Sequence, residues 1–168
     1  MIKGFSTQKN FSLSMFVSEK SMDLLVMCIG NRDGGDDSVG PYIADCLKRE
    51  EIDFKVIDCG VIPENYTADV KRLKPRTLVI VDAVEMNLEP GEIRVVPRER
   101  IGVMHISTHG IPVSLLIKYL NQYVEDIVFI GIQPKSMSGK MTDSVKKNAD
   151  FLVELLKNRN LDKIKILN

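Results

Sequence analysis

The sequence predicts a three-layer α/β fold with a mostly parallel sheet. Short apolar runs alternate with segments whose apolar residues repeat at helical spacing, which is typical of strands joined by crossover helices. The strongest apolar runs carry almost no polar residues, as expected for strands covered on both faces. One further segment alternates apolar and polar residues after a tight turn, which indicates one antiparallel strand at the sheet edge.

Five segments are predicted to form the strands. Glycine, proline or aspartate bounds most of them, and these residue types favour turns over continued strand. In chain order the strands are residues 24–29, 54–57, 77–81, 92–96 and 127–132.

Four segments are predicted to be helices, because their apolar residues fall on one face. Pro41 fits the first turn of the first helix, and Pro75 stops the second. In chain order the helices are residues 39–47, 65–73, 112–123 and 142–158.

The composition argues against several classes of partner. Lys and Arg number 23 and balance the 23 Asp and Glu residues, so no charge excess favours nucleic acid or an anionic membrane. No apolar run approaches the roughly 20 residues of a membrane span, and the N-terminus does not resemble a signal peptide. The three cysteines form no CxxC pair, so we expect reduced, mostly buried thiols and a cytoplasmic protein.

Residues 1–21 differ from the rest of the chain. They show no sustained periodicity, whereas Met22 begins a segment typical of the start of a domain. We therefore expect an N-terminal extension of residues 1–21, either flexible or docked on the fold, and one domain of residues 22–168.

Acidic residues follow three of the predicted strands. Asp36 and Asp37 follow the first strand, Asp58 follows the second, and Asp82 ends the third. Ligands of open α/β sheets bind beyond the carboxyl ends of the strands, so these acids are expected at one rim. Crowded acids repel one another unless a cation or a shared proton offsets them, so we predict a metal-binding rim.

The only two histidines, His105 and His109, lie in one loop before a predicted helix. An imidazole joined to two carboxylates suits a borderline divalent ion such as zinc or nickel.

Each candidate also has a simpler interpretation. Asp36 and Asp37 precede a helix and could cap its free amides, and Asp82 could bond loop amides. A phosphate site in the glycine-rich first loop is disfavoured, because two acids repel phosphate and neither GxGxxG nor GKS/T is present. The sequence contains no HExxH or GxSxG motif, while a Cys59 nucleophile beside His109 stays open.

Several motifs together resemble the nickel–iron hydrogenase maturation proteases. The segment GNRDGGDDSVGP at residues 30–41 resembles the first signature of that family, VDA at 81–83 its strand-end acid, and STH at 107–109 its histidine loop. Three more stretches are similar to the branch that acts on hydrogenases of the formate-hydrogenlyase type. They are PEN at 63–65, PGEIR at 90–94 and GIQP at 131–134.

The resemblance covers about residues 24–156 and implies an activity. Members of the family are endopeptidases with a twisted five-stranded sheet of the phosphorylase/hydrolase type, and each removes a short C-terminal extension from a nickel-loaded hydrogenase large-subunit precursor. The family's two metal-binding acids fall on Asp37 and Asp82, and its histidine falls on His109. Asp36 and Asp58 are then expected to support these ligands from behind.

The resemblance implies nickel supplied by the precursor, or another divalent metal in the same site, bound by Asp37, Asp82 and His109. A metal-polarised carbonyl or metal-activated water would cleave the peptide, with a carboxylate base as the competing mechanism. The alternative function is a non-catalytic, nickel-sensing chaperone with the same fold. Asp45 is expected to lie on the first helix away from the acidic rim.

Overall fold

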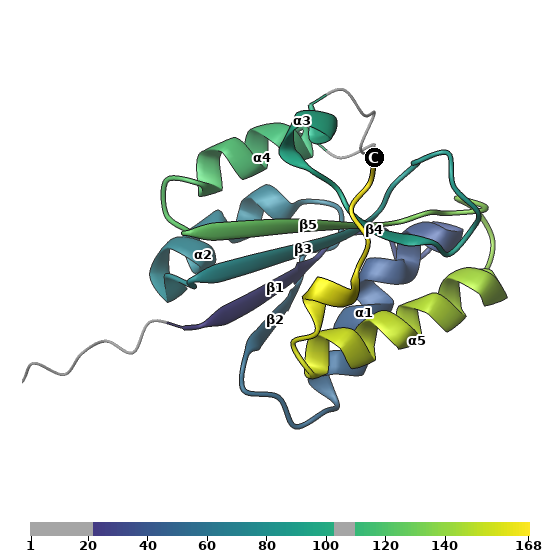
Figure 1. The fold of residues 1–168 in the computed structure, drawn as a ribbon, viewed down its shortest axis with the longest axis horizontal. Helices are drawn as coiled ribbons and strands as arrows, with labels where there is room; N and C mark the ends of the chain where they lie inside the picture. Colours follow the sequence, from purple (N-terminus) through teal and green to yellow (C-terminus); the bar gives the residue numbers. More distant parts are fainter. Residues whose placement is uncertain (1–21, 103–109) are drawn as a thin grey trace, which may run out of the picture.

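A computed structural model describes residues 22–102 and 110–168. A five-stranded sheet with the order β2-β1-β3-β5-β4 forms its centre (Figure 1). Neighbouring strands are parallel except β4, which pairs antiparallel with β5. Both the mostly parallel sheet and its single antiparallel edge strand are therefore confirmed. The strands are β1 (Leu24–Cys28), β2 (Lys55–Asp58), β3 (Thr77–Ala83), β4 (Ile93–Val95) and β5 (Asp126–Ile132).

Helices cover both faces of this sheet, which confirms the three-layer prediction (Figure 1). One face is covered by α1 (Val39–Lys48) and α5 (Asp143–Lys157). The other is covered by α2 (Thr67–Leu73), α4 (Val113–Leu120) and the short α3 (Arg98–Ile101). None of the helices in the described part of the chain has the length and apolarity to cross a bilayer.

Each face of the sheet has its own apolar core. Successive side chains of a strand point to opposite faces, so Val26 of β1 packs with the α1 and α5 side chains while Leu25 packs with those of α2 and α4. Every residue of β1 is buried. This explains why the run contains no polar residue.

Several short elements of the structure were not predicted from the sequence. The four residues of α3 and the 3-10 helices η1 (Gly35–Ser38), η2 (Pro63–Tyr66) and η3 (Leu161–Lys163) are too short for a helical repeat. The second predicted helix is in fact divided into η2 and α2.

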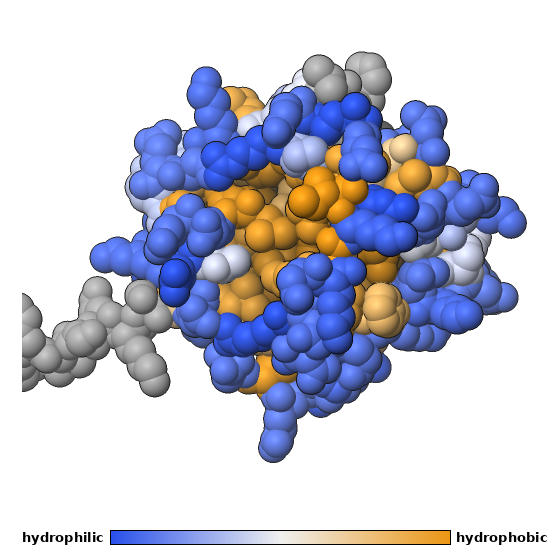
Figure 2. Space-filling model, viewed as in Figure 1, coloured by the Kyte–Doolittle hydropathy of each residue, from blue (hydrophilic) through white to orange (hydrophobic). Residues whose placement is uncertain are grey.

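One surface of the molecule has an apolar centre. Figure 2 shows this area near the edge of the sheet, with polar and charged side chains around it. Ile127 and Val128 of β5 are only partly buried, because β4 pairs with β5 only from Ile130 onwards. The first half of β5 is thus not covered by β4.

Candidate active site

Two glycines bring the Asp37 segment directly against the end of β1. A Cβ atom on Gly30 would lie 1.9 Å from the carbonyl oxygen of Asp37. One on Gly40 would lie 2.0 Å from the carbonyl oxygen of Ile29. Only glycine permits these approaches. The glycines therefore allow η1 and α1 to begin right at the rim of the sheet.

Asp37 and Asp82 are both buried at this rim. Asp37 is 7% exposed, and its Oδ2 accepts a hydrogen bond of 3.0 Å from the backbone N–H of Asn31. Asp82 is 1% exposed and lies within β3, where its Cα is in register with that of Gly131. Strand β3 thus extends past the predicted end and carries the acid itself.

The two acids interact electrostatically. Burial, together with the negative charge of Asp37, raises the pKa of the Asp82 carboxyl well above its usual value, and a backbone hydrogen bond at Ala83 only partly opposes this. A cation bound between the acids would offset their repulsion. Two of the three predicted ligands are therefore close together.

His109, the third predicted ligand, lies outside the described residues, as does His105. Within residues 22–102 and 110–168, no three His, Cys, Asp or Glu side chains form a group able to hold a metal. The described end of the histidine loop is nevertheless close to the rim. A Cβ on Gly110 would lie 2.9 Å from Oε1 of Glu64, and Glu64 belongs to η2, just after β2.

Asp36 organises a neighbouring loop. Its fully buried carboxylate accepts hydrogen bonds from the backbone N–H groups of Lys135, Ser136 and Thr142, at 2.8, 3.0 and 2.7 Å. The Thr142 hydroxyl donates a further bond of 3.0 Å. Burial alone would raise the pKa of Asp36, but these hydrogen bonds outweigh burial and lower it. The capping interpretation is wrong for Asp36, because neither η1 nor α1 has a side-chain cap and the amides that Asp36 binds lie about 100 residues away in sequence.

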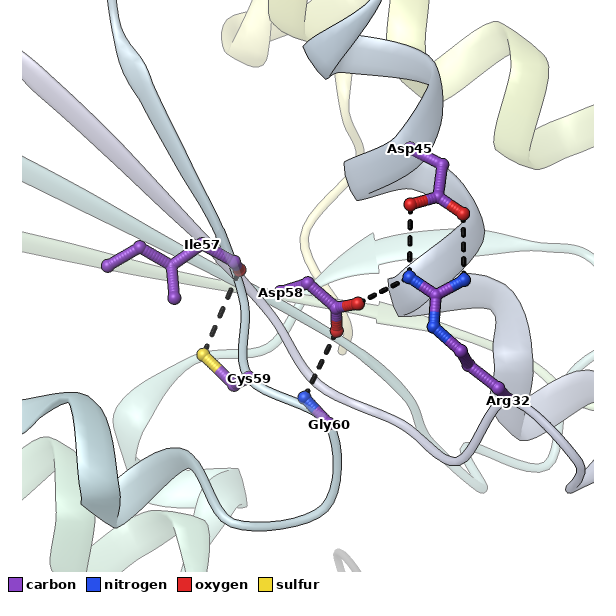
Figure 3. Close-up of polar contacts among 6 residues, drawn as sticks. All are labelled: Arg32, Asp45, Ile57, Asp58, Cys59 and Gly60. Carbon is purple, nitrogen blue, oxygen red and sulfur yellow. Dashed lines mark hydrogen bonds and ion pairs between the residues drawn. The ribbon is translucent and has the colours of Figure 1, made fainter.

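Asp58 and Asp45 share one arginine (Figure 3). Arg32, in the loop after β1, donates two hydrogen bonds to the Asp45 carboxylate, at 2.7 and 3.0 Å, and one of 2.5 Å to Asp58. Asp58 also accepts a 3.1 Å bond from the N–H of Gly60. The expectation that Asp45 lies away from the rim is wrong. Arg32, which was not predicted as a site residue, joins the carboxylates of Asp45 and Asp58.

Asparagine in place of Asp45 should therefore slow the peptidase activity that the sequence motifs imply, because it loosens the loop that precedes Asp37. Arg32 would keep its contact with Asp58 but lose the bidentate ion pair with Asp45. The Arg32–Asp45 pair is partly exposed to solvent, so its contribution is modest. We expect a fall in the rate of about threefold with an unchanged fold. Arg32→Lys should give a similar loss, since a lysine cannot make the forked contact. Equal rates for both variants and the wild type would show that the arginine does not position the loop.

The thiol of Cys59 is unsuited to nucleophilic attack. Cys59 is buried next to the rim, and this burial raises the pKa of its thiol far above the ordinary value, with the charge of Asp58 adding to the effect. Cysteine nucleophiles need a stabilised thiolate. The interpretation of Cys59 and Cys28 as buried apolar residues is confirmed.

Gln133 of the GIQP stretch is a buried polar residue for which the sequence predicted no role. Its Oε1 accepts hydrogen bonds from the backbone N–H groups of Met86 and Leu88, at 2.7 and 3.2 Å. Its Nε2 donates to both carboxylate oxygens of Glu85, at 3.1 and 3.0 Å. The side chain thereby fixes the segment that follows Asp82. Its position directly after the apolar run 127–132 was the sequence feature that could have indicated a buried polar residue at the rim.

Asparagine in place of Asp82 should stabilise the fold by about 1–2 kcal/mol at neutral pH, because it removes a buried carboxylate with a raised pKa. The pKa of an ordinary aspartate carboxyl is about 3.9, and that of Asp82 is higher in the folded protein. The wild type is therefore fully stable below about pH 3.9 and loses stability as the pH rises through the folded-state pKa of Asp82. The advantage of the variant should thus be largest at pH 7 and shrink towards pH 4.

Urea denaturation with a chelator present, at pH 4 and pH 7, measures this difference. Asp126→Asn is the matched control, because Asp126 is exposed at the start of β5. An equal gain in unfolding free energy at both pH values would mean that the ionised Asp82 carboxylate does not destabilise the wild type.

Comparisons with known proteins identify the family. The model of the family described as hydrogenase maturation protease matches residues 41–159. The hydrogenase 3 maturation protease of Escherichia coli K12 is 39% identical over 112 residues, which are 66% of this chain and 72% of that protein.

Solved structures agree with this assignment. The solution structure of the endopeptidase HycI from Escherichia coli superimposes with a TM-score of 0.80 at 32% identity, covering 88% of this chain and 97% of that one. The [NiFe] hydrogenase maturation protease HycI from Thermococcus kodakarensis has a TM-score of 0.73 at 31% identity, covering 84% and 94% of the two chains. Sequence motifs, fold and these similarities agree: the chain is an endopeptidase that belongs to the hydrogenase maturation protease family.

Proposed function

We propose that this endopeptidase removes a short C-terminal extension from the nickel-loaded large-subunit precursor of a nickel–iron hydrogenase. The observation that carries the proposal is the pair of buried acids, Asp37 and Asp82, at the carboxyl edge of the parallel sheet. Two carboxylates in one buried place are unfavourable unless a cation or a shared proton offsets their charges. The precursor's nickel ion would provide that charge, and Asp37, Asp82 and His109 would be its ligands on this chain.

The surrounding residues would hold these ligands in place. The Asn31 amide fixes one oxygen of Asp37, and Gln133 fixes the segment that follows Asp82. The nickel, when bound, supplies Lewis acidity to polarise the scissile carbonyl or a water molecule. A carboxylate of the rim acting as general base is the competing route.

Mass spectrometry of a nickel-loaded precursor incubated with this protein tests the proposal. We expect the loss of one short C-terminal peptide that depends on nickel, whereas the nickel-free precursor stays intact. An intact nickel-loaded precursor that nevertheless binds the protein would favour the nickel-sensing chaperone. Cleavage of casein or unrelated peptides at a similar rate would indicate a general peptidase without a dedicated substrate.

A further inference from the structure

A groove opens beside the acidic rim, between the loop after β1 and the turn after β2. Its volume is about 430 Å³, which falls in the range of pockets that bind small ligands or single side chains. Asn31 and Arg32 line one side, while Gly60, Val61 and Ile62 line the other. The groove is therefore formed by two segments that each follow a parallel strand at its carboxyl end.

The second side of the groove is unusually apolar for a surface turn. Val61 is 42% exposed and Ile62 is 44% exposed, although both side chains are branched and apolar. Isolated exposed apolar residues are common on protein surfaces. Two adjacent ones that border a groove are more informative, because they leave apolar area in water where a partner would cover it.

Hydrogen bonds hold both sides of the groove in place. Ile62 donates its N–H to the carbonyl of Cys59, at 3.3 Å, and accepts from the N–H of Asn65, at 3.1 Å. The Gly60 carbonyl accepts from the N–H of Gly30, at 2.9 Å, which joins the two segments. The apolar side chains are therefore presented on a fixed backbone.

The charged side of the groove is already neutralised in part. The Arg32 guanidinium is shared between Asp45 and Asp58 (Figure 3). A guanidinium engaged by two carboxylates attracts an anionic ligand weakly. The apolar side, where Val61 and Ile62 are exposed, is thus the part of the groove that would gain most from a bound partner.

The groove borders the acidic rim through two residues of the loop after β1. Asn31 lines the groove, and its backbone N–H donates a hydrogen bond of 3.0 Å to the Asp37 carboxylate. Gly30, which also lines the groove, is the residue against which the Asp37 carbonyl packs. A peptide that places its cleavage site at Asp37 and Asp82 would therefore extend along this groove.

We propose that the groove is a specificity subsite that receives one bulky apolar side chain of the precursor segment bound across the acids. The inference rests on the proposed function, because it takes the precursor as the occupant. Covering Val61 and Ile62 would release water from their apolar surface and would favour precursors with an apolar residue at the matching position.

Ile62→Ser tests the subsite, and Ile166→Ser is the matched control. Ile166 is 62% exposed near the C-terminus, where its backbone bridges to Val95. With the nickel-loaded precursor as substrate, we expect Ile62→Ser to raise KM about tenfold with little change in kcat. Ile166→Ser should match the wild type. Because both positions are exposed, circular dichroism and thermal melting should show an intact fold for each. An unchanged KM for Ile62→Ser would overturn the subsite.

Serine substitutions in the precursor identify the side chain that binds. Replacing the apolar residues around the cleavage site one at a time should give one precursor whose KM rises by the same factor with the wild-type enzyme. That precursor should show no further rise with Ile62→Ser, since both changes remove one contact. Fully additive effects for every precursor would contradict the subsite.

A binding measurement separates this inference from the proposed function. In an Asp37→Asn background, Ile62→Ser should weaken binding of the nickel-loaded precursor about tenfold relative to Asp37→Asn alone. If the wild type cuts no precursor, the proposed function fails, and this binding ratio still decides the subsite. Equal binding by the two variants would overturn it.

Discussion

Asparagine in place of Asp37 should abolish processing of the nickel-loaded precursor while the fold stays intact. The substitution keeps the size of the side chain and its acceptor for the Asn31 N–H, but it removes the negative charge. If Asp37 is a metal ligand, the loss of that charge should lower the rate at least about a thousandfold, as for other groups that act directly on the reacting centre. Mass spectrometry of the precursor measures processing, and far-UV circular dichroism measures the fold.

Asp33→Asn is the control for this experiment. Asp33 lies in the same loop and loses the same charge, but its side chain is exposed. Processing by Asp33→Asn should stay close to the wild-type rate. His109→Ala should behave like Asp37→Asn if the histidine completes the ligand set. Full processing by either of these two variants would refute the assignment of that residue.

Alanine in place of Asp36 should destabilise the protein by about 3 kcal/mol, because three backbone N–H groups would lose a charged, buried acceptor. For a chain of this size, that loss corresponds to a melting temperature lower by about 6–12 °C. Asp143→Ala is the control, since Asp143 is exposed in the first turn of α5 and its charge contributes under about 1 kcal/mol.

The Asp36 contribution should also depend on pH. Its pKa in the folded protein is lowered, so the stabilisation is complete above the unfolded value of about 3.9 and is lost as pH falls through the folded-state value. The difference in unfolding free energy between the wild type and Asp36→Ala should therefore narrow in acid. Chemical denaturation from pH 3 to pH 7 measures it. A difference that is constant over this range would mean that the charge of Asp36 is not what holds the loop.

The sequence alone determined the fold class and the edge of the sheet at which the acidic residues gather. Short apolar runs bounded by turn residues, like those of β1 and β3, are typical of strands buried on both faces, and such strands are mostly parallel with helices on both sides. Parallel strands end at one edge of the sheet, so acids that follow separate strands must converge there. For this reason Asp37 and Asp82 were expected at one rim together with Asp36 and Asp58, and the resemblance to the maturation proteases singled out these two as ligands.

The tertiary structure decided which polar groups are bonded to one another across the chain. The sequence showed Asp36 and Asp37 as a pair of adjacent acids. In the structure Asp36 binds amides of the loop after β5, whereas Asp37 accepts a hydrogen bond from the Asn31 N–H and its charge raises the pKa of Asp82. The link from Asp45 through Arg32 to Asp58 also joins residues that are far apart in sequence. Whether two groups form a hydrogen bond depends on differences of a few tenths of an ångström in their distance and on the bond angle. Hydrophobic periodicity sets which face of an element is buried, but it carries no information on such contacts.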